Sequence, residues 1–122
     1  MILQHGTTLQ RANSIMTHGP DIAYHEPGGL GTADGFSCNI LGGPQPLDTV
    51  VRYAQGKSQT FSNEGGPAIL EIDVPAEIVD LADSPWLPVN HGVVQFDEQY
   101  GLEELLKVWD TIPKRIIELR ST

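Results

Sequence analysis

Leu3-Gln4-His5-Gly6-Thr7-Thr8 lies near the start of the chain and joins a short apolar lead to a histidine, a glycine and two hydroxyl residues. Apolar residues then recur at three- and four-residue spacing, which predicts an amphipathic helix with an inner face of Leu9, Ala12, Ile15 and Met16. Gly19-Pro20 is expected to end that helix. A strand that passes into a helix here leaves backbone N–H groups for a polar or anionic ligand. In a plainer interpretation, Thr7 or Thr8 is only a helix N-cap.

The size and charge of the chain narrow the classes of function. At 122 residues it is long enough for one core, so we expect a single domain over residues 1–122. Seven Lys and Arg stand against 16 Asp and Glu, for a net charge of −9, so nucleic acid is not an expected partner. Backbone amides can still hold a mononucleotide or dinucleotide without a basic surface.

Leader, anchor and cysteine patterns add further limits. The start of the chain lacks a basic and apolar leader, and no stretch approaches the roughly 18 apolar residues of a membrane span, so we expect a cytoplasmic protein with no membrane association. Cys38 is the only cysteine, and we interpret it as a core residue of a short strand. The histidines lack the spacing of a metal-binding helix, so no metal site is expected.

Turn residues divide the rest of the chain into short elements. Residues 21–34 are predicted to be a loop, as are 57–61, and residues 76–87 a series of turns. Strands are predicted at 35–40, 68–75, 92–96 and 115–119, and helices at 48–56, closed by Gly56, and at 101–110. With the opening strand and helix, this predicts an α+β domain with a small mixed or antiparallel sheet of four or five strands and about three helices.

The order of these features resembles the ADP-ribosyltransferase fold of toxin-type and PARP-like enzymes, which use NAD. The first match is the His5-Gly6-Thr7 opening with its helix and glycine stop. The second is Gly35-Phe36-Ser37, followed by a helix that carries Tyr53-Ala54. The third is the apolar strand that ends at Pro75. The resemblance covers residues 1–75, and it implies an ADP-ribosyltransferase-like fold with NAD as a substrate.

The resemblance also implies roles for six residues in NAD binding. His5 would hydrogen-bond a ribose hydroxyl, and Thr7 belongs to the same motif. Gly6 would offer its backbone N–H and C=O to the nicotinamide amide, with no Cβ to keep the ring away. Phe36 or Tyr53 would stack on the nicotinamide, and Ser37 would hydrogen-bond its amide.

Cleavage of NAD also needs a carboxylate beside the nicotinamide ribose, where positive charge develops as nicotinamide leaves. In the family this group lies on or beside a late strand, often as Glu-x-Glu or Gln-x-Glu. The nearest equivalent here is Gln95-Phe96-Asp97-Glu98, so Gln95, Asp97 and Glu98 are the candidate catalytic residues. Gln95-x-Asp97 has the spacing of the family motif, but its acid has a shorter side chain than glutamate. Glu98 has the side-chain length of the family residue but stands one position later. Glu71 and Glu103 are the remaining candidates.

Two classes of function follow from the same residues. One is NAD-dependent ADP-ribosyl transfer or NAD hydrolysis, with release of nicotinamide and a protein as one candidate acceptor. The other is a non-catalytic nucleotide-binding or protein-interaction module that keeps the fold without a working carboxylate. We expect the two to differ in whether Asp97 or Glu98 faces the same site as His5.

Overall fold

The computed structural model describes residues 1–20, 35–46 and 48–119, and the predicted loop at 21–34 lies outside them. In the described part, five strands form one sheet in which every pairing is antiparallel. The strands are β1 (Ile2–Thr8), β2 (Phe36–Ile40), β3 (Pro67–Asp73), β4 (Val93–Phe96) and β5 (Lys114–Glu118). The helices are α1 (Leu9–His18), α2 (Thr49–Thr60), α3 (Ala76–Leu81) and α4 (Leu102–Val108), with a 3-10 turn, η1 (Val89–His91). The predicted α+β class is confirmed.

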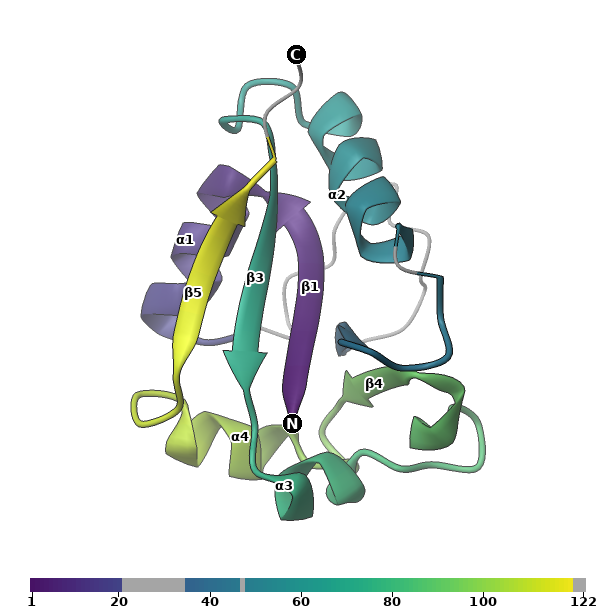
Figure 1. Cartoon of the computed structure of the whole chain (residues 1–122). Helices are drawn as coiled ribbons and strands as arrows, with labels where there is room; N and C mark the ends of the chain where they lie inside the picture. The colour runs from purple at the N-terminus through teal and green to yellow at the C-terminus, as the bar shows by residue number, and fades with distance from the viewer. Residues whose placement is uncertain (21–34, 47, 120–122) are drawn as a thin grey trace.

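Strand β1 is the centre of the sheet, whose order is β4-β2-β1-β3-β5. It pairs with β3 along its whole length, from Ile2↔Asp73 to Thr8↔Pro67. Its pairing with β2 is much shorter and consists of Leu3↔Ile40 and Gln4↔Asn39. Figure 1 shows α2 beside the end of β1, whereas α3 and α4 lie at the opposite end of the sheet.

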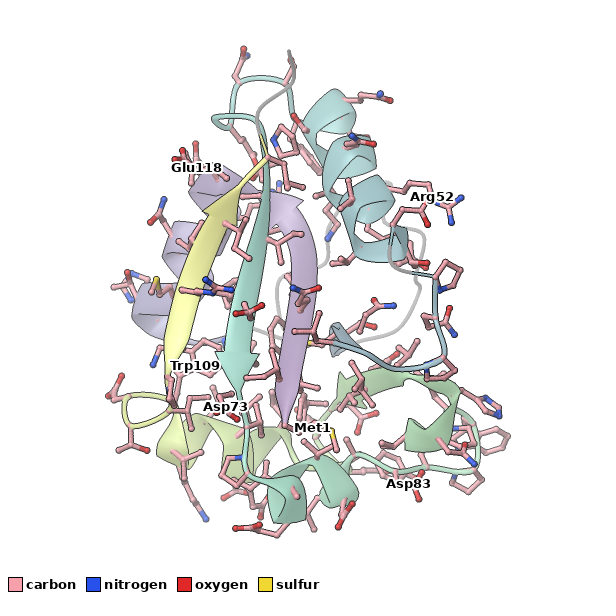
Figure 2. The ribbon with its side chains drawn as sticks, viewed as in Figure 1. Met1, Arg52, Asp73, Asp83, Trp109 and Glu118 are labelled. Carbon is pink, nitrogen blue, oxygen red and sulfur yellow. The ribbon has the colours of Figure 1, made fainter. Side chains whose placement is uncertain are left out.

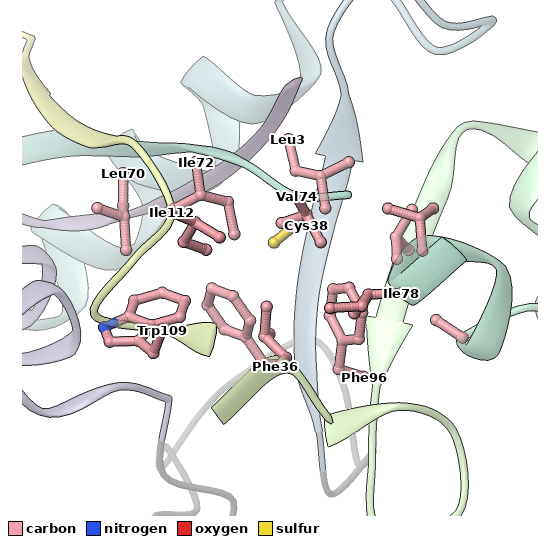
Figure 3. Close-up of a cluster of buried hydrophobic side chains, with 14 of the residues drawn as sticks. Leu3, Phe36, Cys38, Leu70, Ile72, Val74, Ile78, Phe96, Trp109 and Ile112 are labelled. Carbon is pink, nitrogen blue, oxygen red and sulfur yellow. The ribbon is translucent and has the colours of Figure 1, made fainter. Parts of the chain in front are cut away.

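The main core lies on the face of the sheet that α1, α3 and α4 cover. Alternate strand residues point into it because side chains alternate between the two faces, and Figure 3 shows the rings of Phe36 and Trp109 on the side that carries Leu70, Ile72 and Cys38. On the other face, α2 packs on Gly6, and the buried residues Val50, Ala54 and Ile69 stand apart from the main core.

The ends of α1 follow the sequence closely. Thr8 is the N-cap, and its Oγ1 accepts the N–H of Arg11 at 3.3 Å. Gly19 ends the helix with φ +83°, a left-handed value that a residue with a Cβ rarely adopts. The strands predicted from residues 35, 68, 92 and 115 onward are all present within two residues of those starts.

Two helix predictions were wrong. The described residues contain four α-helices instead of about three, because α3 forms where turns were predicted; its Ile78 and Val79 are buried, and this packing outweighs the turn signals. Helix α2 continues through Gly56 to Thr60. There, the Phe61 N–H donates to the Lys57 C=O at 2.8 Å.

Candidate functional site

Among the described residues, the short β1–β2 ladder leaves half of the central strand without a neighbouring strand on one side. Ile2 faces β2, since its C=O accepts the N–H of Leu41 at 3.0 Å. Because N–H and C=O groups of alternate residues point to the same neighbouring strand, Gly6 also directs both of its groups toward β2. The ladder stops at Gln4↔Asn39, so Gly6 has no partner strand on that side within the described residues. We call this part of β1, from His5 to Thr8 and facing β2, the unpaired β1 edge.

The His5 side chain takes the place of a backbone hydrogen bond between β1 and β2. A regular continuation would pair Gly6 with Ser37, but the Ser37 C=O instead binds the His5 Nδ1 at 2.6 Å. A carbonyl only accepts, so Nδ1 carries a proton, and in the neutral ring Nε2 is then an acceptor. The ring lies 4.7 Å from the Phe36 ring, centroid to centroid, at 44°. Two strands that are adjacent in the sheet are thus bridged by a side chain where backbone bonds would otherwise join them.

Gly6 is a glycine for a reason that the sequence did not show. A Cβ at this position would lie 2.4 Å from the Val50 C=O oxygen and 2.9 Å from the Ala54 nitrogen, both in the backbone of α2. The missing Cβ therefore admits a helix, and the prediction that it lets a ring approach is corrected. What Gly6 can offer a ligand is the N–H and the C=O in the plane of the sheet.

The two candidate stacking residues differ in exposure. Phe36 is 5% exposed and packs between His5 and Trp109, whose ring is 6.2 Å away at 82°. Tyr53 on α2 is 45% exposed, and its Cβ is 3.2 Å from the position of a Gly6 Cβ. Of the two rings, Tyr53 is the one that a ligand at the unpaired β1 edge can reach.

Gln95 lies next to this edge through the register of the sheet. Ser37 pairs with Gln95 of β4, so their side chains lie on the same face as neighbours. Ser37 is exposed and Gln95 is half-buried. The structure therefore brings Gly6, Ser37, Tyr53 and Gln95 to one part of the sheet on the face that α2 covers, while the His5 side chain lies on the core face beside Phe36.

Asp97 and Glu98 follow β4 in a tight turn. The Asp97 Oδ1 accepts the N–H of Gln99 at 2.9 Å, and its C=O accepts that of Tyr100 at 3.0 Å. Glu98 lines a hollow of about 590 Å³ between the end of α1 and the start of α4. The residues around that hollow do not include His5; they are His18, Gly19, Pro20, Glu98, Leu102, Glu103 and Leu106. In the described part of the chain, Glu98 thus lines this hollow and His5 does not.

The other candidate carboxylates are held by cations. Glu71, on the open face of β3, accepts from Gln4 at 3.0 Å and from Arg115 at 2.6 Å, and the Arg115 hydrogen bond lowers its pKa. Glu103 lies 3.7 Å from Lys107 on the exposed side of α4. Neither lies beside the unpaired β1 edge in the sheet register.

The start of α1 is not an anion site, and this expectation was wrong. The N–H of Leu9 donates to the Gly66 C=O at 2.9 Å, and the N–H of Gln10 donates to the Glu64 C=O at 3.0 Å. The third N–H, that of Arg11, donates to the Thr8 Oγ1. The Glu64 carboxylate also accepts from Thr8 Oγ1 at 2.8 Å and from Arg11 Nε at 2.6 Å, and the Arg11 bond lowers its pKa. Sequence reasoning missed Glu64, because nothing local shows that a residue 56 positions away closes this helix end.

Thr7 shows a different kind of polar feature. It is fully buried, and its Oγ1 has no hydrogen-bond partner in the described residues. Cys38 is also buried, and burial raises the pKa of its thiol, which suits the predicted core role.

In the described ranges, no group of three or more His, Cys, Asp and Glu side chains could hold a metal ion, and no helix is long and apolar enough to span a membrane.

No protein-family model, no curated protein and no solved structure matches this chain.

Proposed function

We propose that this chain binds NAD at the unpaired β1 edge, with the nicotinamide carboxamide on the backbone of Gly6. The observation that carries the proposal is the direction of the Gly6 N–H and C=O, which face β2 at a point where no strand among the described residues pairs with them. A carboxamide has one acceptor oxygen and an NH2 donor, so it complements this pair as a neighbouring strand would. An aromatic amide is thus a chemical fit to the gap in the ladder.

The side chains around Gly6 suit the rest of a nicotinamide riboside. The exposed Tyr53 ring offers a stacking surface, and the exposed Ser37 hydroxyl can bond the carboxamide. The His5 ring, whose Nδ1 donates to the Ser37 C=O, is the side chain that we assign to a ribose hydroxyl.

The activity that we propose is ADP-ribosyl transfer or NAD hydrolysis. The bond between nicotinamide nitrogen and ribose C1′ breaks, and its electron pair leaves with neutral nicotinamide. A nucleophile of an acceptor, or water, then bonds to C1′ and loses a proton. A carboxylate near C1′ stabilises the cationic ribose in the transition state. Asp97, two residues beyond Gln95, is the candidate for this role, and a protein side chain is the class of acceptor that we expect.

A second candidate is NAD binding without turnover, in a sensor or interaction module. The position of Glu98 favours it, since this carboxylate lines the hollow between α1 and α4 and not the surface beside His5. Asp97 is then the residue that decides between the two functions.

Calorimetry with NAD, followed by chromatography of the same sample for free nicotinamide, tests both. We expect saturable binding and nicotinamide release. Ser37→Ala should weaken binding several-fold, whereas Ser62→Ala, at an exposed turn after α2, should not. Asp97→Asn keeps an oxygen for the Gln99 N–H, so it should retain binding and lose release.

The outcomes separate the two functions. Binding without release by the unmodified protein supports the non-catalytic module. No binding at millimolar NAD, or equal losses in the two serine variants, contradicts both.

A further inference from the structure

The outer edge of β5 is open in the described residues. Asp73 N–H donates to the Pro113 C=O at 3.0 Å and Leu119 N–H to the Pro67 C=O at 2.9 Å, so residues 113, 115, 117 and 119 face β3. By alternation, the N–H and C=O groups of Lys114, Ile116 and Glu118 point outward. No hydrogen bond occupies them among the described residues, and Figure 1 shows β5 as the outermost strand on its side of the sheet.

Natural edge strands are usually protected by charges, prolines or bulges that stop another strand from pairing. The two cations of β5 do not act in this way. Lys114 Nζ folds back on its own chain to donate to the carbonyls of Trp109 and Ile112, and Arg115 Nε donates to Glu71 at 2.6 Å. The strand itself, Lys114-Arg115-Ile116-Ile117-Glu118, contains no proline. Its edge is therefore left able to pair.

The charge pattern of β5 is complementary to itself in one orientation. If two copies run antiparallel with Ile116 opposite Ile116, Lys114 of each copy lies opposite Glu118 of the other. Lys114 has three donors and uses two, so one is left for that carboxylate. A parallel arrangement in the same register would set Lys114 against Lys114. Only the antiparallel pairing joins opposite charges.

The same register also uses the outward backbone groups. Lys114, Ile116 and Glu118 are the residues whose N–H and C=O point away from β3, and they are the three that meet about the two-fold axis at Ile116. Such a ladder would contain about six inter-chain hydrogen bonds. Figure 2 shows Glu118 at the end of β5 that is far from Trp109, and Lys114 Nζ donates to the Trp109 C=O. The positive charge of β5 therefore lies at one end of the strand and the negative charge of Glu118 at the other.

We propose that β5 pairs antiparallel with β5 of a second copy of this chain, about a two-fold axis at Ile116, and so joins two sheets into one. This is independent of NAD binding. Two five-residue strands make a small interface, so we expect a concentration-dependent dimer with a Kd on the order of 100 µM.

Sedimentation velocity over a concentration series that brackets this value tests the proposal. Salt of about 0.15 M limits the range of the repulsion between two chains of charge −9. The unmodified protein should shift from monomer to dimer across the series. Glu118→Lys sets like charges opposite each other at both ends of the ladder, and should weaken the dimer by about tenfold or more.

Two further variants control for net charge and for folding. Glu77→Lys makes the same change of charge on the exposed surface of α3 and should dimerise as the unmodified protein does. The double variant Lys114→Glu with Glu118→Lys restores opposite charges and should recover the dimer, with circular dichroism to check that it folds. A monomer at every concentration, or a dimer that Glu118→Lys and Glu77→Lys affect equally, overturns the proposal.

Discussion

Gly6→Ala should destabilise the protein by much more than one methyl group suggests. The added Cβ would lie 2.4 Å from the Val50 oxygen, and ordinary contacts begin at 3.4 Å, so β1 and α2 must separate by about 1 Å (3.4 − 2.4). Both close atoms, the Val50 oxygen and the Ala54 nitrogen, belong to the backbone of α2, so no side-chain rotation relieves the contact. Overpacking of this kind costs about 1–3 kcal/mol, and the absence of a flexible neighbour places Gly6→Ala near 3 kcal/mol.

Gly56→Ala is the matched control on the solvent side of the same helix. Nothing lies within 4 Å of a Cβ at this position, and Gly56 is inside α2. Alanine in a helix is favoured over glycine, so this variant should gain about 0.5–1 kcal/mol.

Urea unfolding and thermal unfolding, both followed by circular dichroism, measure the free energy of unfolding and the melting temperature of each variant. The melting temperature of Gly6→Ala should fall by about 12 °C, at about 4 °C per kcal/mol for a chain of this size. If Gly6→Ala is as stable as the unmodified protein, or if Gly56→Ala loses as much, then the close contact between β1 and α2 is not what the glycine serves.

Three further predictions concern Glu64, Cys38 and Thr7. The pKa of Glu64 is lower in the folded than in the unfolded protein, so its contribution to stability is complete above the unfolded value near 4.5 and is lost as pH falls through the folded value. Glu64→Gln removes the charge from the hydrogen bonds with Arg11 and Thr8, so it should cost about 2 kcal/mol at pH 7 and flatten an acid titration of stability. Cys38, buried with a raised pKa, should not react with a thiol reagent at pH 8 until the protein is unfolded, and reaction at the rate of a free thiol would contradict its burial. Thr7→Val removes a buried hydroxyl without a partner in the described residues, so it should raise the free energy of unfolding by about 1 kcal/mol, and a loss of stability would mean that Oγ1 is bonded.

Sequence patterns predicted the elements of this fold best where the signals are local. Thr8 before an apolar helical pattern, and Gly19-Pro20 after it, mark both ends of α1. The strand predicted at 68–75 places its alternating residues Leu70, Ile72 and Val74 in the core. These features depend on residues a few positions apart, so the sequence carries them directly.

The errors arose where distant residues decide the structure. Gly56 is a helix terminator by local rules, but α2 continues until Phe61, whose ring lies 3.8 Å from the Arg11 guanidinium. No local pattern shows which helix lies over Gly6, or that Glu64 closes the start of α1. Pairings over such separations follow only from the assembled sheet.

The candidate site was predictable as a set of residue types but not as a geometry. The His5-Gly6 pair was identified from its motif, yet the early end of the β1–β2 ladder and the bond from His5 to Ser37 depend on strand register. The same register places Gln95 opposite Ser37, while the turn after Phe96 places Glu98 at the hollow between α1 and α4. Gln95 and Glu98 are only three positions apart in the sequence, so spacing along the chain could not show that they lie in different surroundings.

The most direct test of NAD binding at the unpaired β1 edge is the amide proton resonance of Gly6 in a nitrogen-15 labelled sample titrated with NAD. Our account predicts that this resonance moves downfield and saturates, because its N–H gains an acceptor, while the amides of Gly42 and Gly56 stay in place. Saturable NAD binding that leaves the Gly6 resonance unmoved would contradict the account, as would the absence of any change at millimolar NAD.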